Sequence, residues 1–366
     1  MKAAVLHGFN EPLKIEEVKL DPPKEHEVLV KIVATGVCHS DLSVIEGKFP
    51  YMTPVVLGHE AAGIVEETGS EVTTVARGDH VVLSFMPECG HCAYCLSGKP
   101  HLCQKGMESL AVGGLMDGTT RLSSGGSPVY HFMGLSSFAE RAVVHESVAI
   151  KISPDIPLDR ACLIGCGVTT GVGAAIHTAQ VEPLSTVAVI GCGGVGLNVI
   201  QGATMAGARV IVAVDVRDDK LELAKTFGAT HTVNAKKDDA ISKIMDYADG
   251  LGADYSFEVI GRPETVATAF GALRPGGVCV VVGVAPIDAV MEVTPMALMQ
   301  EKTLKGCIYG SSKPKVDMPR LLHAYQAKKL KLDELVSRTY PLEGINEAFD
   351  AMRRGDVARS VIRLAA

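Results

Sequence analysis

The sequence predicts an α/β protein in which a doubly wound parallel-sheet domain is inserted into a mainly β domain. In residues 1–150, short strand-like runs are separated by turn signals, which is typical of antiparallel sheets with loops. These runs are 28–33, 62–66, 80–83 and 142–144. In residues 185–310, continuous apolar runs alternate with helical segments, the pattern of parallel strands buried on both faces.

The end of the chain returns to the mixed pattern of its first part. Two amphipathic helices are expected near 318–326 and 344–353, followed by a last strand at 360–364. The expected domain limits are therefore 1–167 for the first part of the β-rich domain, 168–309 for the inserted domain and 310–366 for the second part. A cysteine-rich lobe is expected at 86–105.

Composition restricts the possible partners and compartment. The 366 residues carry a net charge of −7 at pH 7, which disfavours nucleic acid and anionic membranes. We find neither an apolar run of about 18 residues that would span a membrane nor the pattern of a secretion signal. Ten cysteines in such a chain indicate a reducing compartment where thiolates bind metal, so we expect a cytoplasmic protein.

Four of the cysteines follow the pattern C-x2-C-x2-C-x7-C. They are Cys89, Cys92, Cys95 and Cys103. Four thiolates at this spacing predict one closed tetrahedral zinc site, which is structural because no coordination position stays open for chemistry. A disulfide pair or a redox C-x-x-C is the alternative.

The run TVAVIGCGGVG predicts a dinucleotide site. It places Gly191, Gly193 and Gly196 at G-x-G-x-x-G spacing, with Gly194 and Val195 inside the turn, between a strand at 186–190 and a helix at 197–206. The first glycine permits a tight turn, the second lets the backbone approach a pyrophosphate, and the third lets helix pack on strand. The helix N-terminus then supplies N–H groups for the phosphates.

The next strand, 209–214, is followed by Asp215, nineteen residues beyond Gly196. A carboxylate at this place accepts hydrogen bonds from the ribose hydroxyls of NAD and repels the 2′-phosphate of NADP, so we predict NAD over NADP. Arg217 and Lys220 follow it, and a basic residue here weakens that discrimination. A surface turn residue is the alternative interpretation of Asp215.

Three further residues can form a second zinc site with an open position. Cys38, His59 and Cys166 each lie at the glycine-flanked end of an element, and Glu60 follows the histidine directly. Two cysteines and one histidine are a known ligand set of catalytic zinc. Taken singly, each residue has an ordinary alternative, a small core cysteine or a histidine in a satisfied polar contact.

These motifs together resemble the zinc-dependent alcohol dehydrogenases of the medium-chain dehydrogenase/reductase superfamily. The resemblance covers nearly the whole chain: GHE at 58–60, the four-cysteine lobe, GCGVTTG at 165–171, the glycine-rich turn with its aspartate, and the final RS segment. It implies a Rossmann domain inserted into a GroES-like catalytic domain. It also implies NAD and two zinc ions per subunit, one catalytic and one structural.

The resemblance implies that Cys38, His59 and Cys166 are the ligands of the catalytic zinc. Glu60 then exchanges with substrate or water as a ligand, and Asp41 orients the histidine and fixes its tautomer. Zinc acts as a Lewis acid on the alcohol oxygen while hydride passes to the nicotinamide.

The proton path is expected to begin at Ser40, which takes the hydroxyl proton and passes it to the NAD ribose. Ser43 stands where relatives often carry a histidine. A serine cannot act as a general base near pH 7, so the path must end in water or by direct transfer from the ribose.

The resemblance also implies contacts with cofactor and substrate. Thr170 and Val195 pack against the nicotinamide ring, Val284 holds its carboxamide, and His39 and Arg359 contact the pyrophosphate. The expected substrate pocket is apolar, which favours medium-chain or aromatic primary alcohols and their aldehydes over polyols. Its residues are Phe49, Phe85, Leu102, Phe132, Met133 and Val284.

Three alternatives to this activity stay open. An S-(hydroxymethyl)glutathione dehydrogenase shares the framework, but the segment 104–110 contains Lys105 and no arginine for the two carboxylates of its substrate. A nicotinoprotein would keep NAD bound through turnover. A protein that binds NAD and zinc without catalysis is the third. The long stretch 104–137 resembles the dimeric branch of the family, and strands at 278–282 and 291–293 can pair across a two-fold axis, so we expect a homodimer.

Overall fold

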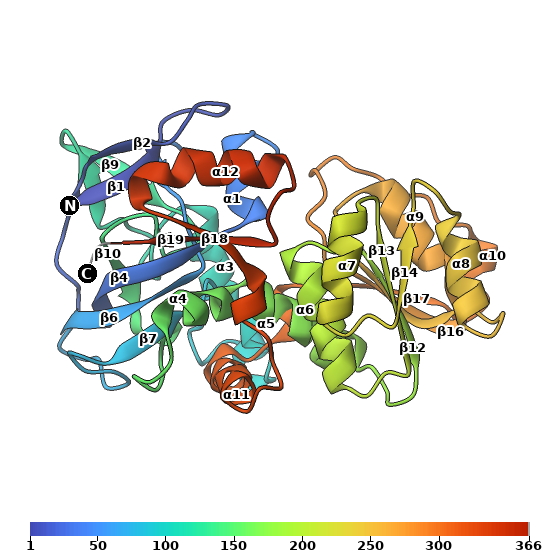
Figure 1. Cartoon of the computed structure of the whole chain (residues 1–366). Helices are drawn as coiled ribbons and strands as arrows, with labels where there is room; N and C mark the ends of the chain where they lie inside the picture. The colour runs from blue at the N-terminus through green and yellow to red at the C-terminus, as the bar shows by residue number, and fades with distance from the viewer. Residues whose placement is uncertain (365–366) are drawn as a thin grey trace. The chain divides into compact units, whose positions relative to one another are not determined.

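A computed structural model describes residues 1–364 of the chain (Figure 1). Its contacts divide the chain into two compact units. The first joins Met1–Cys166 to the segment that begins at Lys313, and the second is Gly167–Ser312. The predicted insertion of one domain into another is therefore confirmed. Within residues 1–364, each helix taken by itself falls short of the length or apolar character of a membrane span; Leu158–Gly165 and Gly167–Ala179, with a bend between them, reach it only together.

The second unit is built on one six-stranded parallel sheet, β14-β13-β12-β15-β16-β17. The strands are β12 (Thr186–Ile190), β13 (Val210–Asp215), β14 (His231–Asn234), β15 (Ala253–Glu258), β16 (Leu273–Val281) and β17 (Thr303–Gly306). This is the doubly wound order, with a switch point between β12 and β15. β12 is buried along its whole length because helices cover both faces of the sheet.

The helices of this unit lie on the two faces of the sheet. They are α5 (Gly167–Gly173), the π-helix η4 (Ala174–Ala179), α6 (Gly194–Met205), α7 (Asp218–Thr226), α8 (Ala240–Tyr247), α9 (Pro263–Gly271), α10 (Pro295–Leu298) and the short turn η5 (Tyr309–Ser311). In Figure 1, α6 and α7 lie on one side of the strands, and α8 and α9 lie on the other. The crossover from β14 to β15 changes sides, as the strand order requires.

Within the single chain, residues 291–293 form no strand, whereas their expected pairing across a two-fold axis needs a second chain and stays a prediction. Apolar and polar side chains alternate here as they do in a strand. The edge of β16 that could pair with them is occupied by β17, with Leu304 opposite Cys279. Pro295 also follows closely and begins α10. A strand forms only where a neighbouring backbone supplies hydrogen-bond partners, and alternation alone does not provide one.

The first unit contains two mainly antiparallel sheets, ordered β2-β1-β5-β9-β8-β3 and β11-β7-β6-β4-β19-β18, with β10 also paired to β4. The strands are β1 (Lys2–Leu6), β2 (Lys14–Glu17), β3 (Lys19–Leu20), β4 (Glu27–Val37), β5 (Val55–Val56), β6 (Ala61–Thr68), β7 (His80–Leu83), β8 (Leu122–Ser124), β9 (Ser127–His131), β10 (Arg141–His145), β11 (Ala149–Lys151), β18 (Val336–Tyr340) and β19 (Arg359–Arg363). A large apolar cluster from both parts of the unit forms its core.

The helices of the first unit are mostly short. They are α1 (His39–Ile45), α2 (Ala93–Leu96), α3 (Gln104–Ala111), α4 (Leu158–Ala161), α11 (Pro314–Gln326) and α12 (Ile345–Arg353), with turns of 3-10 helix at η1 (Pro100–Leu102), η2 (Glu146–Val148), η3 (Cys162–Gly165), η6 (Asp333–Leu335) and η7 (Leu342–Gly344). The predicted helix near 318–326 begins four residues earlier, at Pro314. Proline is favoured at the first helical position because its fixed φ suits the helix and its missing N–H is not needed there.

Three strands of the second sheet bring their ends to one place. β4 pairs with β6, with Thr35 opposite Ala61, and with β19, with Val37 opposite Ser360. Because both pairs are antiparallel, the residue that follows β4 lies beside the residues that precede β6 and begin β19. The backbone therefore brings Cys38 close to the His-Glu pair at 59–60 and to the arginine that opens β19.

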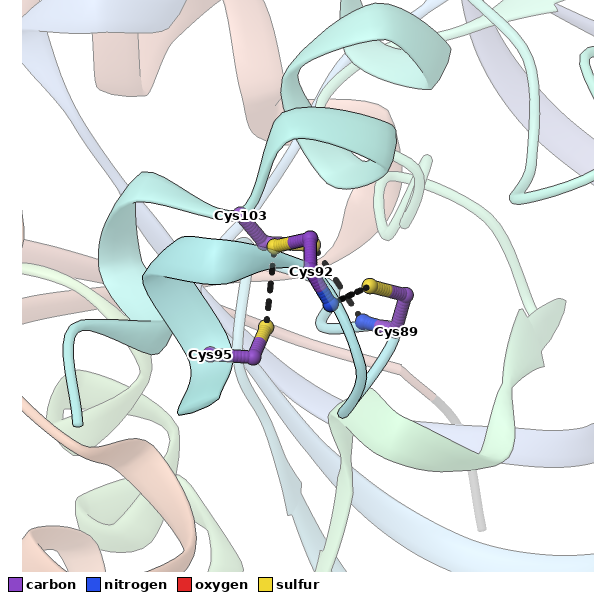
Figure 2. A group of neighbouring side chains, drawn as sticks. All are labelled: Cys89, Cys92, Cys95 and Cys103. Carbon is purple, nitrogen blue, oxygen red and sulfur yellow. Dashed lines mark hydrogen bonds between the residues drawn. The ribbon is translucent and has the colours of Figure 1, made fainter. Parts of the chain in front are cut away.

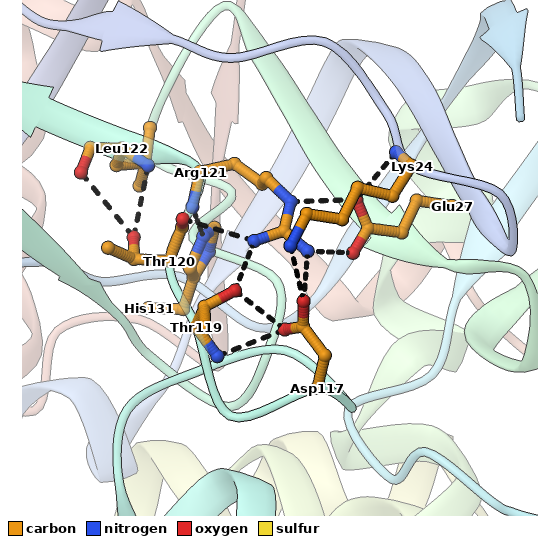
Figure 3. Close-up of polar contacts among 8 residues, drawn as sticks. All are labelled: Lys24, Glu27, Asp117, Thr119, Thr120, Arg121, Leu122 and His131. Atoms are coloured by element: carbon orange, nitrogen blue, oxygen red, sulfur yellow. Dashed lines mark hydrogen bonds and ion pairs between the residues drawn. The ribbon is translucent and has the colours of Figure 1, made fainter.

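A buried ion-pair network ties β4 to the loop before β8 (Figure 3). The Arg121 side chain is 3% exposed; its Nε donates to one carboxylate oxygen of Glu27 at 2.8 Å and its Nη2 donates to the other. Nη2 also lies 2.7 Å from a carboxylate oxygen of Asp117. The Arg121 backbone N–H donates to Nε2 of His131. Burial and the nearby Arg121 lower the pKa of this histidine to about 3, which keeps it a neutral acceptor.

We expect Glu27→Gln to lower the free energy of unfolding by about 3 kcal/mol or more, because it leaves the buried guanidinium without its bidentate carboxylate. The matched control is Glu66→Gln. It breaks a bidentate pair with Arg141 (2.6 and 3.3 Å) whose side chains are 31% and 41% exposed, and it should cost about 1 kcal/mol or less. Chemical denaturation measures both values, and equal losses would contradict the expectation.

Candidate functional site

Four buried side chains of the first unit gather where the strands end. Cys38, His59, Glu60 and Cys166 each offer one ligand atom, and these atoms all lie within 4.8 Å of one another. Zinc–sulfur bonds of about 2.3 Å at tetrahedral angles place two sulfur ligands roughly 3.8 Å apart, so this spacing suits a single ion. Cys166 reaches the group from the end of η3.

The Asp41 carboxylate lies behind this group and orients the histidine. Its Oδ1 is 3.2 Å from Nδ1 of His59 and accepts the Gly58 N–H at 2.9 Å, while its Oδ2 accepts the Cys38 N–H at 3.2 Å. An ionised carboxylate only accepts hydrogen bonds, so Nδ1 carries the proton. In the neutral imidazole, Nε2 is therefore left with the lone pair that a metal needs.

A buried ion pair adjoins the donor group. Nη1 of Arg359 lies 3.1 Å from Oε1 of Glu60, and the two side chains are 5% and 0% exposed. Gly36 makes room for the carboxylate, since a Cβ there would lie 2.3 Å from Oε2 of Glu60. The pyrophosphate contact expected of Arg359 stays a prediction. Its pairing with Glu60 had no signal in the sequence, because the two residues are 299 positions apart.

The electrostatics of the group favour a bound cation. A hydrogen bond from Cys166 lowers the pKa of Cys38 well below its usual range. Burial alone disfavours a charged His59, but Asp41 and Cys38 together raise its pKa. Burial raises the pKa of Glu60 to about 7, against the influence of Arg359. So many acidic groups at one buried point require positive charge to balance them, which a divalent metal supplies.

Aromatic rings surround the histidine. Phe85 and Phe132 meet the His59 ring edge to face, with centroids 5.7 and 5.4 Å away. Tyr51, which the sequence did not single out, packs edge to face on Phe132 at 5.2 Å and stacks on Phe49 at 6.4 Å. Three of the predicted pocket residues thus belong to one aromatic group beside the donor cluster.

The remaining predicted residues occupy different places. Ser40 lies on α1 with its Oγ 3.8 Å from Sγ of Cys38, and His39 is exposed at the start of that helix. Met133 is half-buried against the core of the first unit, and Leu102 ends η1 beside the cysteine lobe. Thr170 on α5, Val195 on α6 and Val284, which is 63% exposed, belong to the second unit.

The four-cysteine lobe forms a second group of possible ligands (Figure 2). The Sγ atoms of Cys89, Cys92, Cys95 and Cys103 lie within 4.8 Å of one another, and all ten cysteines are free. Backbone N–H groups donate to two of the sulfurs, from Cys92 to Cys89 and from Cys89 to Cys103. Such bonds stabilise thiolates, and backbone bonds likewise lower the pKa of Cys92 to about 6. These donors fit a closed zinc site, and no disulfide joins them.

The glycine-rich turn lies between β12 and α6, at the carboxyl ends of the strands. Gly191 has φ +104°, a conformation that favours glycine, and a Cβ at Gly196 would lie 1.9 Å from the Gly191 carbonyl oxygen. Asp215, at the end of β13, accepts the Cys192 N–H of this turn at 2.9 Å. The helix N-terminus and the carboxylate thus stand together, as a dinucleotide site requires.

We expect Asp41→Asn to weaken zinc binding at the Cys38 group by about 10- to 100-fold. The NH2 group of the amide would face an N–H group whose hydrogen bond the carboxylate accepts in the parent protein. Zinc retained during dialysis against chelators of increasing strength measures the change. Asp79→Asn, which disrupts a surface pair with Lys151, is the control and should retain zinc as the parent does. Equal retention in both variants would show that Asp41 does not support the metal.

Cys95→Ser should reduce the zinc content by about one ion per chain and lower the melting temperature by roughly 5–10 °C, because metal binding replaces a hydrophobic core in this lobe. Cys307→Ser, which removes a cysteine outside both ligand groups, should leave the zinc content unchanged. Metal analysis and calorimetry of the two variants provide the measurement. A Cys95→Ser protein with full zinc content and unchanged stability would refute the assignment.

Comparison with known proteins agrees with this architecture. Residues 24–154 match the family model of the alcohol dehydrogenase GroES-like domain, and residues 194–327 match that of the zinc-binding dehydrogenase. A structure of an alcohol dehydrogenase zinc-binding domain protein from Burkholderia ambifaria is 38% identical with a TM-score of 0.95, covering 100% of this chain and 99% of its own.

Two further solved structures are informative. Benzyl alcohol dehydrogenase from Acinetobacter calcoaceticus is 37% identical with a TM-score of 0.94 and the same coverage of both chains. A putative zinc-binding dehydrogenase from Sinorhizobium meliloti 1021, bound to NADP, is 26% identical with a TM-score of 0.79, covering 99% of this chain and 98% of its own. The chain therefore belongs to the zinc-dependent medium-chain dehydrogenase/reductase family, whose members are oxidoreductases.

Proposed function

We propose that this protein is an NAD-dependent zinc alcohol dehydrogenase that interconverts primary medium-chain or aromatic alcohols and their aldehydes. The observation that carries the proposal is the buried donor group of Cys38, His59 and Cys166, with Asp41 behind the histidine. A zinc ion held there supplies Lewis-acid activation of an alcohol oxygen, and NAD supplies the hydride acceptor.

The protein's own groups have distinct tasks in this reaction. Asp41 holds His59 in one tautomer through its contact with Nδ1. Ser40, whose Oγ lies 3.8 Å from Sγ of Cys38, would relay the substrate hydroxyl proton, accepting it as its own hydroxyl proton passes on to the NAD ribose. Glu60, balanced by Arg359, stands among the donor atoms as an exchangeable ligand.

An aromatic or apolar substrate is supported by the rings of Phe85 and Phe132 beside His59. Such rings bind the apolar body of an alcohol and exclude water from the reacting carbon. The 37% identical benzyl alcohol dehydrogenase is consistent with this class of substrate.

The preference for NAD rests on Asp215 at the end of β13. Its Oδ2 accepts the Cys192 N–H at 2.9 Å, and its Oδ1 accepts the Val216 and Arg217 N–H groups at 2.7 and 3.1 Å. The carboxylate is thereby fixed beside the glycine-rich turn, where it can bind ribose hydroxyls and repel a 2′-phosphate.

A homodimer is also proposed. The edge strand β17 offers an unpaired row of backbone groups, and Ile287, Val290, Met296 and Met299 in the preceding segment are each more than two-thirds exposed. Sedimentation should give twice the chain mass of 38.5 kDa, and a purely monomeric protein would reject the pairing. The cytoplasmic location, with neither nucleic acid nor membrane as partner, stays a prediction.

The direct test is a substrate screen with the purified protein. With NAD, benzyl and linear C4–C8 alcohols should be oxidised at least about tenfold more efficiently than glycerol, and Ser40→Ala should slow hydride transfer about 10²-fold or more. Formaldehyde mixed with glutathione is assayed in parallel, because it tests the alternative activity of an S-(hydroxymethyl)glutathione dehydrogenase. Nucleotide released on denaturation reveals whether NAD stays bound. No turnover of any alcohol with NAD or with an external acceptor would overturn the proposal.

A further inference from the structure

The turn after β13 carries two groups with opposite preferences for the cofactor. Asp215 repels a 2′-phosphate, whereas an arginine close to that position can bind one. Arg217 follows only two residues later, and its backbone N–H donates to the Asp215 carboxylate at 3.1 Å. The guanidinium therefore starts from the same turn that would hold the adenosine ribose.

Arg217 is engaged by a carboxylate of the next helix. Its Nε lies 3.0 Å from Oδ1 of Asp219, and its Nη2 lies 2.8 Å from Oδ2. Two parallel N–H···O bonds of this kind match the planar guanidinium to the carboxylate and fix its direction. Asp219 lies in the first turn of α7, where a negative charge is also favourable to the helix.

We propose that Asp219 is a specificity-determining residue, which acts through Arg217. By pairing with the guanidinium, it withholds from a 2′-phosphate the cation that would bind it. This inference rests on the NAD preference proposed above and assigns part of that preference to Asp219.

The pair can be opened by mutation without disturbing the core. The side chains of Arg217 and Asp219 are 35% and 62% exposed, so water screens the pair and it contributes little to folding. A phosphate is a stronger partner for the guanidinium than water, so removal of Asp219 should transfer Arg217 to the phosphate of NADP.

Asp218 provides a matched control. It is the first residue of α7, carries the same charge and is 65% exposed. Its carboxylate pairs with Lys237 at 2.7 Å and accepts from the Asn234 amide at 2.6 Å. Asp218→Ala and Asp219→Ala therefore each remove one negative charge from the same helix turn, but only Asp219→Ala removes the bidentate partner of Arg217.

The test is the dissociation constants of NADH and NADPH, measured by fluorescence titration of the full-length zinc-loaded protein. Asp219→Ala should tighten NADPH binding at least about fivefold and leave NADH within about twofold, whereas Asp218→Ala should change both by less than about twofold. Arg217→Gln in the Asp219→Ala background should abolish the gain. The variant with Asp219→Ser provides the same readout should the alanine protein be poorly folded.

The outcomes separate this inference from the proposed function. Equal gains in NADPH affinity from Asp218→Ala and Asp219→Ala would show that only net charge matters, and would overturn the role of Asp219. Unchanged NADPH binding in both Asp219→Ala and Asp219→Ser would also overturn it. A parent protein that binds NADPH more tightly than NADH would instead overturn the proposed NAD preference itself.

Discussion

The contact between Asp41 and His59 is the interaction on which the rest of the site depends. One carboxylate accepts N–H groups from Gly58, three residues before β6, from Cys38, directly after β4, and from the imidazole itself. It therefore fixes the backbone on both sides of the site and the tautomer of the ligand at once. The strands that adjoin these residues, β4 and β6, are antiparallel neighbours, so paired strands anchor the short segments that carry the donors.

Charge balance explains why the site is both buried and acidic. Two thiols, Glu60 and Asp41 would be costly to ionise together inside the protein. Arg359 offsets part of this charge at 3.1 Å from Glu60, and a divalent ion would offset the rest. In the cysteine lobe, binding of a metal by thiolates would serve stability and not catalysis. It is built of short helices and turns with little apolar packing, and four sulfurs around one ion would take the place of a core.

Much of this organisation could be predicted from the sequence because its motifs combine residue type with spacing. The parallel sheet followed from apolar runs, and the two cysteine-containing groups followed from their glycine-flanked or regularly spaced ligands. Contacts between distant residues that belong to no recognised motif could not be predicted, since neither the Glu60–Arg359 pair nor the place of Tyr51 leaves a local pattern. Residues 291–293 form no strand within the single chain for a related reason. Alternation reports which side chains suit a sheet, whereas β17 already occupied the available edge. The Arg217–Asp219 pair is local, but charge spacing alone does not tell which acid holds the arginine.

Anomalous diffraction at the zinc edge, from crystals of the purified protein, tests the central claim most directly. The account predicts an ion bonded to Sγ of Cys38 and of Cys166 at about 2.3 Å and to Nε2 of His59 at about 2.0–2.1 Å, in addition to the ion in the cysteine lobe. Two results would contradict it. One is a zinc peak in the cysteine lobe alone, and the other is zinc bound to Nδ1 of His59, the atom that contacts Asp41 in this account.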